Sequence, residues 1–264
     1  MTLIIGILCQ DGIVVGSDGA ATMGVLGMQT AKQSVKKLTL HHNCIITGIS
    51  GSVGLSQRIN GTIEALYADA KNLSGKKPFQ AMPIIGQRIW LDCLKQEYDI
   101  AVEAQKLIGG NLAQLSCMSA SVVAMPISKE LCLFQFNHQA HGEMATKDIP
   151  FIAIGSGQFC ADPFLAFIKR IFWPDRLPKL SEGIFATYWT LDQAIKTSPG
   201  GVADPKQIAV LESKDGKPIC RELTESELNP IKEAVTDAEN RLKDLNKPSA
   251  NAEAIPKPVA AATA

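Results

Sequence analysis

The sequence lacks the short motifs that identify most enzyme classes. It contains no Gly-x-Ser-x-Gly elbow, no Walker phosphate loop, no His-Glu-x-x-His segment and no cysteine spacing of the zinc-binding type. His138 and His141 have a spacing that could hold a metal ion, but no third ligand accompanies them. We therefore expect neither a metal nor a cofactor.

An excess of charge and long apolar runs are also missing. Lys+Arg and Asp+Glu are both 26, so the composition does not favour nucleic acid or an anionic membrane as a partner. The longest apolar runs, such as residues 3–9, are far shorter than the roughly 20 residues of a membrane span. The N-terminus carries no pattern of a secretory signal. These absences predict a cytoplasmic protein with no membrane partner.

The cysteines show no pattern of disulfides. There are seven, an odd number, and no two form a CxxC pair. Most lie in apolar stretches, where a free cysteine behaves as a small buried hydrophobe. We expect reduced, structural thiols.

Several strands are expected before the first helix. With 264 residues, 46% hydrophobic and 20% charged, the chain can bury a sizeable core. Residues 2–9 and 12–17 are extended, apolar runs joined by Asp11-Gly12, a dipeptide suited to the positive φ angles of a tight hairpin. Two more runs cover 34–40 and 43–50, with Asn43 in the turn between them. The sequence thus predicts four strands.

Helix pairs then alternate with strands. Apolar residues recur at threes and fours from Leu55 to Ala70, and again over 82–108 up to Gly109-Gly110, which predicts two helices packed as an antiparallel pair. The remaining expected elements are strands at 119–126, 131–137 and 150–155, helices at 158–172 and 181–196, and strands at 206–212 and 217–223 joined by Asp215-Gly216. This order predicts an α+β protein with two sheets face to face and helices outside.

The C-terminal part is expected to lie outside this 1–223 domain. Thr224 and Glu227 have capping-box spacing and begin a helix over about 224–247, which either covers its own domain or pairs with another chain. Residues 248–264 are rich in alanine and proline, with little to bury, and are expected to form a disordered tail.

Four segments together resemble the proteasome β-subunit family, and especially its bacterial HslV branch. They are Ser17-Asp18-Gly19-Ala20-Ala21-Thr22-Met23-Gly24, Val35-Lys36-Lys37-Leu38, Gly48-Ile49-Ser50-Gly51-Ser52-Val53-Gly54 and Ile152-Ala153-Ile154-Gly155-Ser156-Gly157. The resemblance covers about residues 1–170, and the C-terminal helix goes beyond HslV. It suggests a distinct bacterial branch, such as the beta-proteobacterial proteasome homologue.

The resemblance implies a fold and a nucleophile. The fold is the four-layer αββα sandwich of N-terminal-nucleophile (Ntn) hydrolases, with two antiparallel sheets flanked by helices. Removal of Met1 would leave Thr2 with a free α-amine, whose ordinary pKa of about 7.7 to 8.0 lets it act as general base for its own hydroxyl. The resemblance thus implies a threonine-type endopeptidase.

The resemblance also assigns the residues around Thr2. Lys37 would favour the alkoxide, Asp18 would keep that lysine charged, the backbone N–H of Gly51 would stabilise the oxyanion, and Ser156 would order the α-amine. Taken singly, each residue has an ordinary structural explanation, such as Asp18 capping a turn or Gly51 shaping one. Their joint order and spacing favour the catalytic interpretation.

In the family, one pocket of the substrate site receives the side chain that precedes the cut bond. The residues at the matching positions here are Thr22 and four small or aliphatic residues. The four are Ala21, Val35, Ile49 and Val53. They predict a preference for apolar side chains, although ordinary core residues would give the same pattern.

Two departures from the family stand out. The stretch Lys196-Thr197-Ser198-Pro199-Gly200-Gly201 lacks the acid usual there, and a lysine near the α-amine would lower the pKa of that amine. The loop between Thr22 and Lys37 is about three residues longer than usual.

The resemblance implies a homo-oligomeric assembly of stacked hexamers or heptamers that cleaves peptides or unfolded proteins, with an ATP-dependent unfoldase as a further partner. Two alternatives remain open. The chain could be an inactive structural ring subunit, which the Lys196 region favours and the combination of Thr2, Asp18 and Lys37 does not. It could also be a non-peptide amidase of the Ntn class.

Overall fold

The computed structural model describes residues 2–25, 28–69, 73–109, 118–197 and 201–245. Its centre is formed by two five-stranded antiparallel sheets. The first sheet contains, in order, β10 (Phe151–Ile154), β1 (Ile4–Leu8), β2 (Gly12–Ser17), β11 (Gln207–Lys214) and β12 (Lys217–Glu222). The second contains β5 (Leu38–His41), β6 (Ile45–Ser50), β7 (Ala120–Ile127), β8 (Glu130–Phe136) and β9 (Gly142–Met144).

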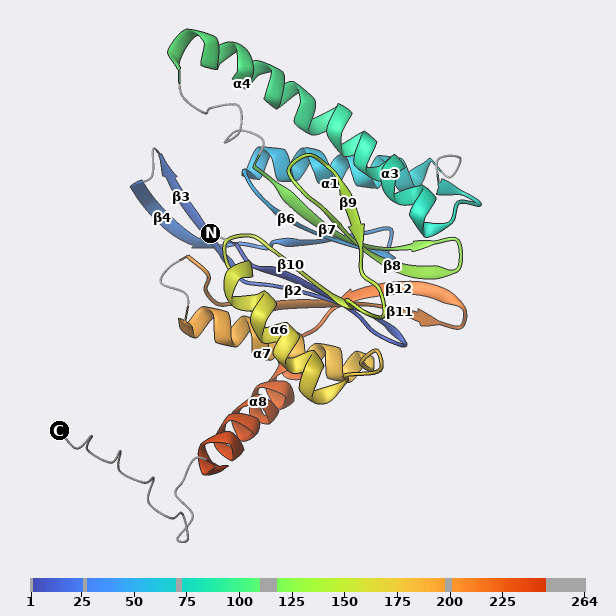
Figure 1. Ribbon diagram of the computed structural model, residues 1–264, viewed down its shortest axis with the longest axis vertical. Coiled ribbons are helices and arrows are strands. Elements are labelled where there is room, and N and C mark those ends of the chain that lie inside the picture. The colour runs from blue at the N-terminus through green and yellow to red at the C-terminus, as the bar shows by residue number, and fades with distance from the viewer. Residues whose placement is uncertain (1, 26–27, 70–72, 110–117, 198–200, 246–264) are drawn as a thin grey trace, which may run out of the picture.

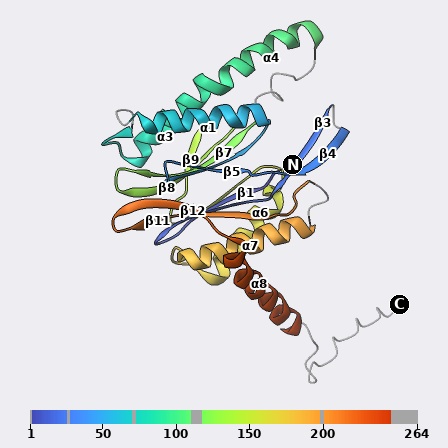
Figure 2. The same ribbon diagram turned by 180° about the vertical axis from the view of Figure 1, so that it is seen from behind.

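Helices cover the outer faces of both sheets, as Figures 1 and 2 show from opposite sides. On the first sheet lie α6 (Gln158–Phe172) and α7 (Leu180–Thr197). On the second lie α1 (Val53–Ala68) and α3 (Pro78–Ile89), and α3 continues through a wider π-type turn (Trp90–Leu94) into α4 (Lys95–Ile108). The predicted α+β class with two packed sheets is therefore confirmed.

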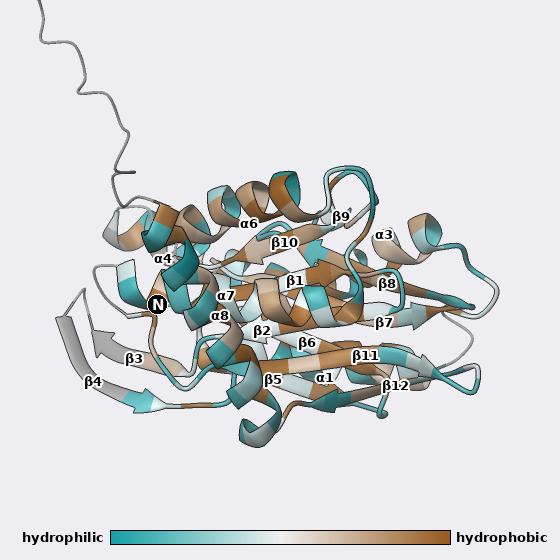
Figure 3. Cartoon of the chain, turned by 90° about the horizontal axis from the view of Figure 1, so that it is seen from below, coloured by the Kyte–Doolittle hydropathy of each residue, from teal (hydrophilic) through white to brown (hydrophobic). Residues whose placement is uncertain are grey.

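Three hydrophobic layers hold these elements together. One lies between the sheets and contains Ile4, Val15, Ile46 and Leu133, while the other two lie beneath the helices of each sheet. Successive residues of β1 alternate between layers, since Ile4 faces the second sheet and Ile5 faces α6 and α7. Figure 3 shows hydrophobic residues along β1 and β11. Because β1 is buried on both faces, its sequence is continuously apolar.

Both predicted hairpins at Asp-Gly pairs form, but with different turns. Asp215 and Gly216 have φ angles of 51° and 74°, as a tight turn between β11 and β12 requires. Asp11 and Gly12 are absent from the residues with positive φ, and Gly12 already belongs to β2. A Cβ on Gly12 would lie 2.7 Å from the carbonyl oxygen of Leu211, so this glycine serves strand packing.

The expectation of four strands before the first helix is wrong. A two-stranded sheet of β3 (Ala20–Val25) and β4 (Met28–Ser34) occupies the segment that the sequence left as a long loop. It projects beyond the two central sheets in both views (Figures 1 and 2). The expected strand at 34–40 is divided between the end of β4 and the start of β5. The short strand β9 was also missed.

The second helix begins at Pro78, four residues earlier than the spacing of apolar residues predicts. Proline suits the first turn of a helix, and Gln80 accepts a hydrogen bond from the backbone N–H of Lys77, so the start is capped. Helix α1 begins similarly, with the Ser52 hydroxyl accepting a hydrogen bond from the N–H of Leu55.

The C-terminal helix α8 (Glu225–Leu245) packs on α7 of its own chain. Val235 is buried in the same hydrophobic cluster as residues of α6 and α7, whereas Leu242 and Leu245 are exposed. The expected tail at 248–264 lies outside the described residues. Within the described part of the chain, no helix is long and apolar enough to cross a membrane. The six described cysteines are free thiols, and Cys117 lies outside that part.

Candidate active site

The centre of the site is the carboxylate of Asp18, which is completely buried just after β2. Its Oδ1 accepts hydrogen bonds from the N–H of Leu3 at 2.9 Å and from Lys37 Nζ at 2.7 Å. Its Oδ2 accepts from the N–H groups of Ala20 at 3.2 Å and Ala203 at 3.4 Å. These four donors compensate for the loss of water around the charge.

The Lys37 ammonium links this carboxylate to Thr2. Lys37 lies in the connection from β4 to β5, and its side chain is 8% exposed. Its Nζ lies 3.2 Å from Thr2 Oγ1. Burial lowers the pKa of Lys37, and the hydrogen bond and charge of Asp18 act in the opposite direction. The pair therefore places a cation, held by a buried anion, against the threonine hydroxyl.

Gln207, the first residue of β11, supports this lysine and carries no signal in the sequence. Its Oε1 accepts a hydrogen bond from the backbone N–H of Lys37 at 2.9 Å, and its Nε2 donates to the carbonyl oxygen of Val35 at 2.6 Å. The buried Gln207 is brought there by the pairing of β11 with β2, in which it lies opposite Ser17.

Thr2 is held from its other side by the turn between β10 and α6. Its nitrogen donates to Ser156 Oγ at 3.1 Å, and its carbonyl oxygen accepts from the N–H of Gly157 at 3.1 Å. Gly155 has a φ of +93°, and a Cβ there would lie 2.2 Å from the carbonyl oxygen of Thr2. Only glycine allows this turn to approach Thr2 so closely.

This close approach predicts an effect of Gly155→Ala. We expect the free energy of unfolding to fall by about 3 kcal/mol, because the positive φ angle and the clash with Thr2 each cost about 1–2 kcal/mol. Gly75→Ala is the matched control, since Gly75 has a φ of +68° but no atom within 4 Å of the added Cβ. It should cost only about 1 kcal/mol. Urea unfolding of both variants measures this, and equal losses would contradict the contact.

A cavity of about 620 Å³ opens beside Thr2. Gly51 and Ser156 contribute to its wall, so three of the five expected catalytic residues meet there. Its other lining residues come from four segments and include Ser119, His138, Gln158 and Phe159. Sequence spacing could not identify them, because they meet only through the packing of β7, β8 and α6.

Parts of the chain are similar in sequence to proteasome β subunits. No protein-family model matches the chain. Proteasome subunit beta of Methanobrevibacter smithii is 39% identical over 64 residues, which cover 24% of this chain and 30% of that protein. Proteasome subunit beta of Methanococcus vannielii is 31% identical over 109 residues, which cover 41% of this chain and 47% of that protein. The matched stretches thus span less than half of either relative.

Solved structures match over nearly the whole chain. Anbu, described as an ancestral β-subunit, from Yersinia bercovieri superposes with a TM-score of 0.67 at 15% identity, covering 94% of this chain and 98% of that one. The chain has the fold of the Anbu proteins. The structure of the helical assembly of the Anbu complex from Pseudomonas aeruginosa gives a TM-score of 0.62 at 16% identity and covers 99% and 100% of the two chains.

Among the described side chains of this Anbu-like fold, four residues expected to line the substrate pocket do not line the cavity beside Thr2: Ala21, Val35, Ile49 and Val53. Ile49 is 8% exposed and packs into the layer beneath α1, whereas Val53 is 65% exposed at the start of α1. Ala21 and Val35 are half-buried. The side chain of Thr22 lies outside the described residues.

Lys196 forms ion pairs with residues of two helices. The Lys196 ammonium lies 2.6 Å from Asp192 on α7 and 3.5 Å from Glu239 on α8. The nitrogen of Thr2 instead has Ser156 as its hydrogen-bond partner. Two carboxylates on the helices thus bind the charge of Lys196, and its effect on the pKa of a free Thr2 amine stays a prediction. Ser198 lies outside the described residues.

Proposed function

We propose that this chain is a threonine-type endopeptidase of the Ntn class, with Thr2 as its nucleophile once Met1 is removed. The observation that carries the proposal is the chain of contacts from buried Asp18 through Lys37 to the Thr2 hydroxyl, at the wall of a cavity. The two face-to-face sheets with helices outside support the finer assignment to the αββα sandwich of that class.

The proposed reaction begins with a proton transfer within Thr2. The free α-amine accepts the proton of Oγ1, and the oxygen attacks the carbonyl carbon of the substrate peptide bond. The Lys37 charge stabilises the developing alkoxide, and the Gly51 N–H donates to the oxyanion of the tetrahedral intermediate. Its collapse breaks the C–N bond, the leaving amine takes the proton, and an ester on Thr2 remains. Water then hydrolyses this ester and restores the hydroxyl.

The proposal extends to the assembly. We propose that the chain forms homo-oligomeric rings of stacked hexamers or heptamers in the cytoplasm that admit peptides or unfolded proteins, with an ATP-dependent unfoldase as partner. Exposed apolar side chains on α6 support contacts between copies: Phe159, Phe167, Ile171 and Phe172. The similarity to proteasome β subunits and to Anbu, one structure of which is a helical assembly, supports the association of several copies, and the number of subunits in a ring stays a prediction. Membership of the beta-proteobacterial branch stays a prediction.

The decisive experiment is the intact mass of the purified protein before and after treatment with a peptide epoxyketone. This reagent forms a stable adduct only with a free α-amine and its neighbouring hydroxyl. We expect loss of the mass of Met1 and one adduct per chain, which Thr2→Ala abolishes.

Retention of Met1 in the purified protein, with no adduct, would overturn the proposal in favour of an inert ring subunit. An adduct accompanied by hydrolysis of small amides, but not of peptides, would instead favour the non-peptide amidase. Turnover of short fluorogenic peptides separates these two enzyme classes.

A further inference from the structure

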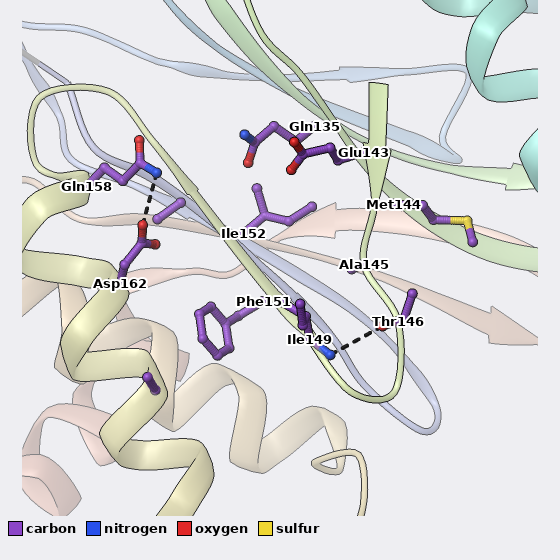
Figure 4. A pocket seen from close by; sticks show the side chains of 12 residues that line it. Gln135, Glu143, Met144, Ala145, Thr146, Ile149, Phe151, Ile152, Gln158 and Asp162 are labelled. Carbon is purple, nitrogen blue, oxygen red and sulfur yellow. Dashed lines mark hydrogen bonds between the residues drawn. The ribbon is translucent and has the colours of Figure 1, made fainter. Parts of the chain in front are cut away.

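A second cavity of about 470 Å³ continues from the one beside Thr2. The two cavities share Gln135 and Gln158 in their walls. The second lies between β9, β10 and the start of α6, as Figure 4 shows. The proposed catalytic mechanism uses none of its side chains.

The walls of this second cavity are apolar in the middle and acidic at both sides. In Figure 4, Glu143 lies beside Gln135 on one side, Asp162 lies beside Gln158 on the other, and Ile152 lies between them. Glu143 and Gln135 face each other across β8 and β9. The cavity therefore offers two carboxylates flanking an aliphatic surface.

Neither carboxylate has a cation as partner within the described part of the chain. Asp162 accepts a hydrogen bond at 2.9 Å from Gln158, whose amide is neutral. Burial raises the pKa of Asp162, which is half-buried, and the hydrogen bond from Gln158 acts in the opposite direction, whereas Glu143 is exposed at the rim of the cavity. A guanidinium between these side chains would give Asp162 a cationic partner and lie within reach of Glu143, and its aliphatic stem would cover Ile152.

The distance from Thr2 follows from β10. Gly155 and Ser156 line the first cavity, whereas Phe151 and Ile152 line the second. Ala153 also lines the second cavity and Ile154 the first, so the cavities adjoin along β10, and the middles of the two stretches lie about three or four residues apart, about 10–13 Å at about 3.3 Å per residue. An extended peptide advances by the same rise, so its side chain three or four residues from the cut bond would reach the second cavity.

We propose that this second cavity binds an arginine or lysine side chain of the substrate, three or four residues from the bond that Thr2 cleaves. The proposal rests on the proposed function for the identity of the cut bond. Binding of the basic side chain in the cavity does not require that the bond be cleaved. The site would favour peptides that carry a basic residue at this one distance.

Binding to the full-length Thr2→Ala variant tests this without hydrolysis. The probes are fluorescently labelled decapeptides that share the same central residues around the bond to be cleaved. In one series arginine is placed at each other position in turn, and in the second series its neutral analogue citrulline takes the same positions. By anisotropy, we expect arginine to bind about tenfold more tightly than citrulline at a position three or four residues from the centre, and this ratio to fall as salt is raised.

The double change Glu143→Gln/Asp162→Asn should bring that ratio to about one and leave the affinity for the citrulline peptide unchanged. Glu130→Gln/Asp175→Asn, two exposed acids outside the cavity, is the matched control and should preserve the ratio. Equal binding of arginine and citrulline at every position, no measurable binding of any peptide, or a ratio that survives the double change would each overturn the proposal. If a second copy of the chain covered the cavity, neither side chain could enter it, and the arginine and citrulline peptides would bind equally. If the parent protein formed no epoxyketone adduct while its Thr2→Ala variant still preferred arginine, the proposed peptidase activity would be contradicted. The proposed binding site would be supported.

Discussion

Replacing Thr2 by alanine is expected to lower kcat/KM for peptide hydrolysis by at least about 1000-fold. The variant loses the hydroxyl that lies 3.2 Å from Lys37 Nζ. Alanine is small, so Met1 should be removed from the variant as it is from the parent. The two proteins would then differ only at the nucleophile. Hydrolysis of fluorogenic peptides measures kcat/KM, and the intact mass shows whether Met1 has been removed.

Two further variants delimit this result. Thr2→Ser keeps the hydroxyl and should retain activity within about tenfold. Thr236→Ala removes a hydroxyl on exposed α8, where Thr236 donates to the carbonyl oxygen of Lys232, and should leave kcat/KM unchanged. Full activity of Thr2→Ala would show that a different residue performs the chemistry.

Replacing Lys37 by methionine is expected to lower the free energy of unfolding by about 3 kcal/mol, since it leaves the buried Asp18 carboxylate without its cation. It should also abolish detectable hydrolysis, because the charge beside the Thr2 hydroxyl is lost. Urea unfolding at one fixed protein concentration measures the first effect, since assembly contributes to apparent stability.

The neighbouring lysine supplies the control. Lys36 lies 2.8 Å from Glu222, but its side chain is 75% exposed, so Lys36→Met should cost less than about 1 kcal/mol. Asp18→Asn combined with Lys37→Met removes both buried charges and should recover part of the lost stability without restoring activity. Equal unfolding free energies for the two single lysine variants would contradict a structural role of the Asp18–Lys37 pair.

Much of the fold follows from local patterns along the chain. The recurrence of apolar residues places α6 at its observed bounds, and the Asp215-Gly216 pair predicts the hairpin of β11 and β12. The hairpin of β3 and β4 was missed because its residues, which include glycines, glutamines and alanines, show neither strong β-propensity nor alternation. Among the described residues, these strands pair with each other and with neither central sheet.

The sequence by itself determined most strands and helices, though not β3, β4 and β9, and the two-sheet class. It also singled out the small set of residues on which the proposal of a hydrolase depends: Thr2, Asp18, Lys37, Gly51 and Ser156. Only the tertiary structure decided which further side chains join them. Gln207 reaches Lys37 because β11 lies next to β2, Lys196 turns to carboxylates on α7 and α8, and Glu143 faces Asp162 across a cavity. The physical reason is that periodicity and turn chemistry act over a few residues, whereas these contacts join segments that only the order and register of the sheets bring together.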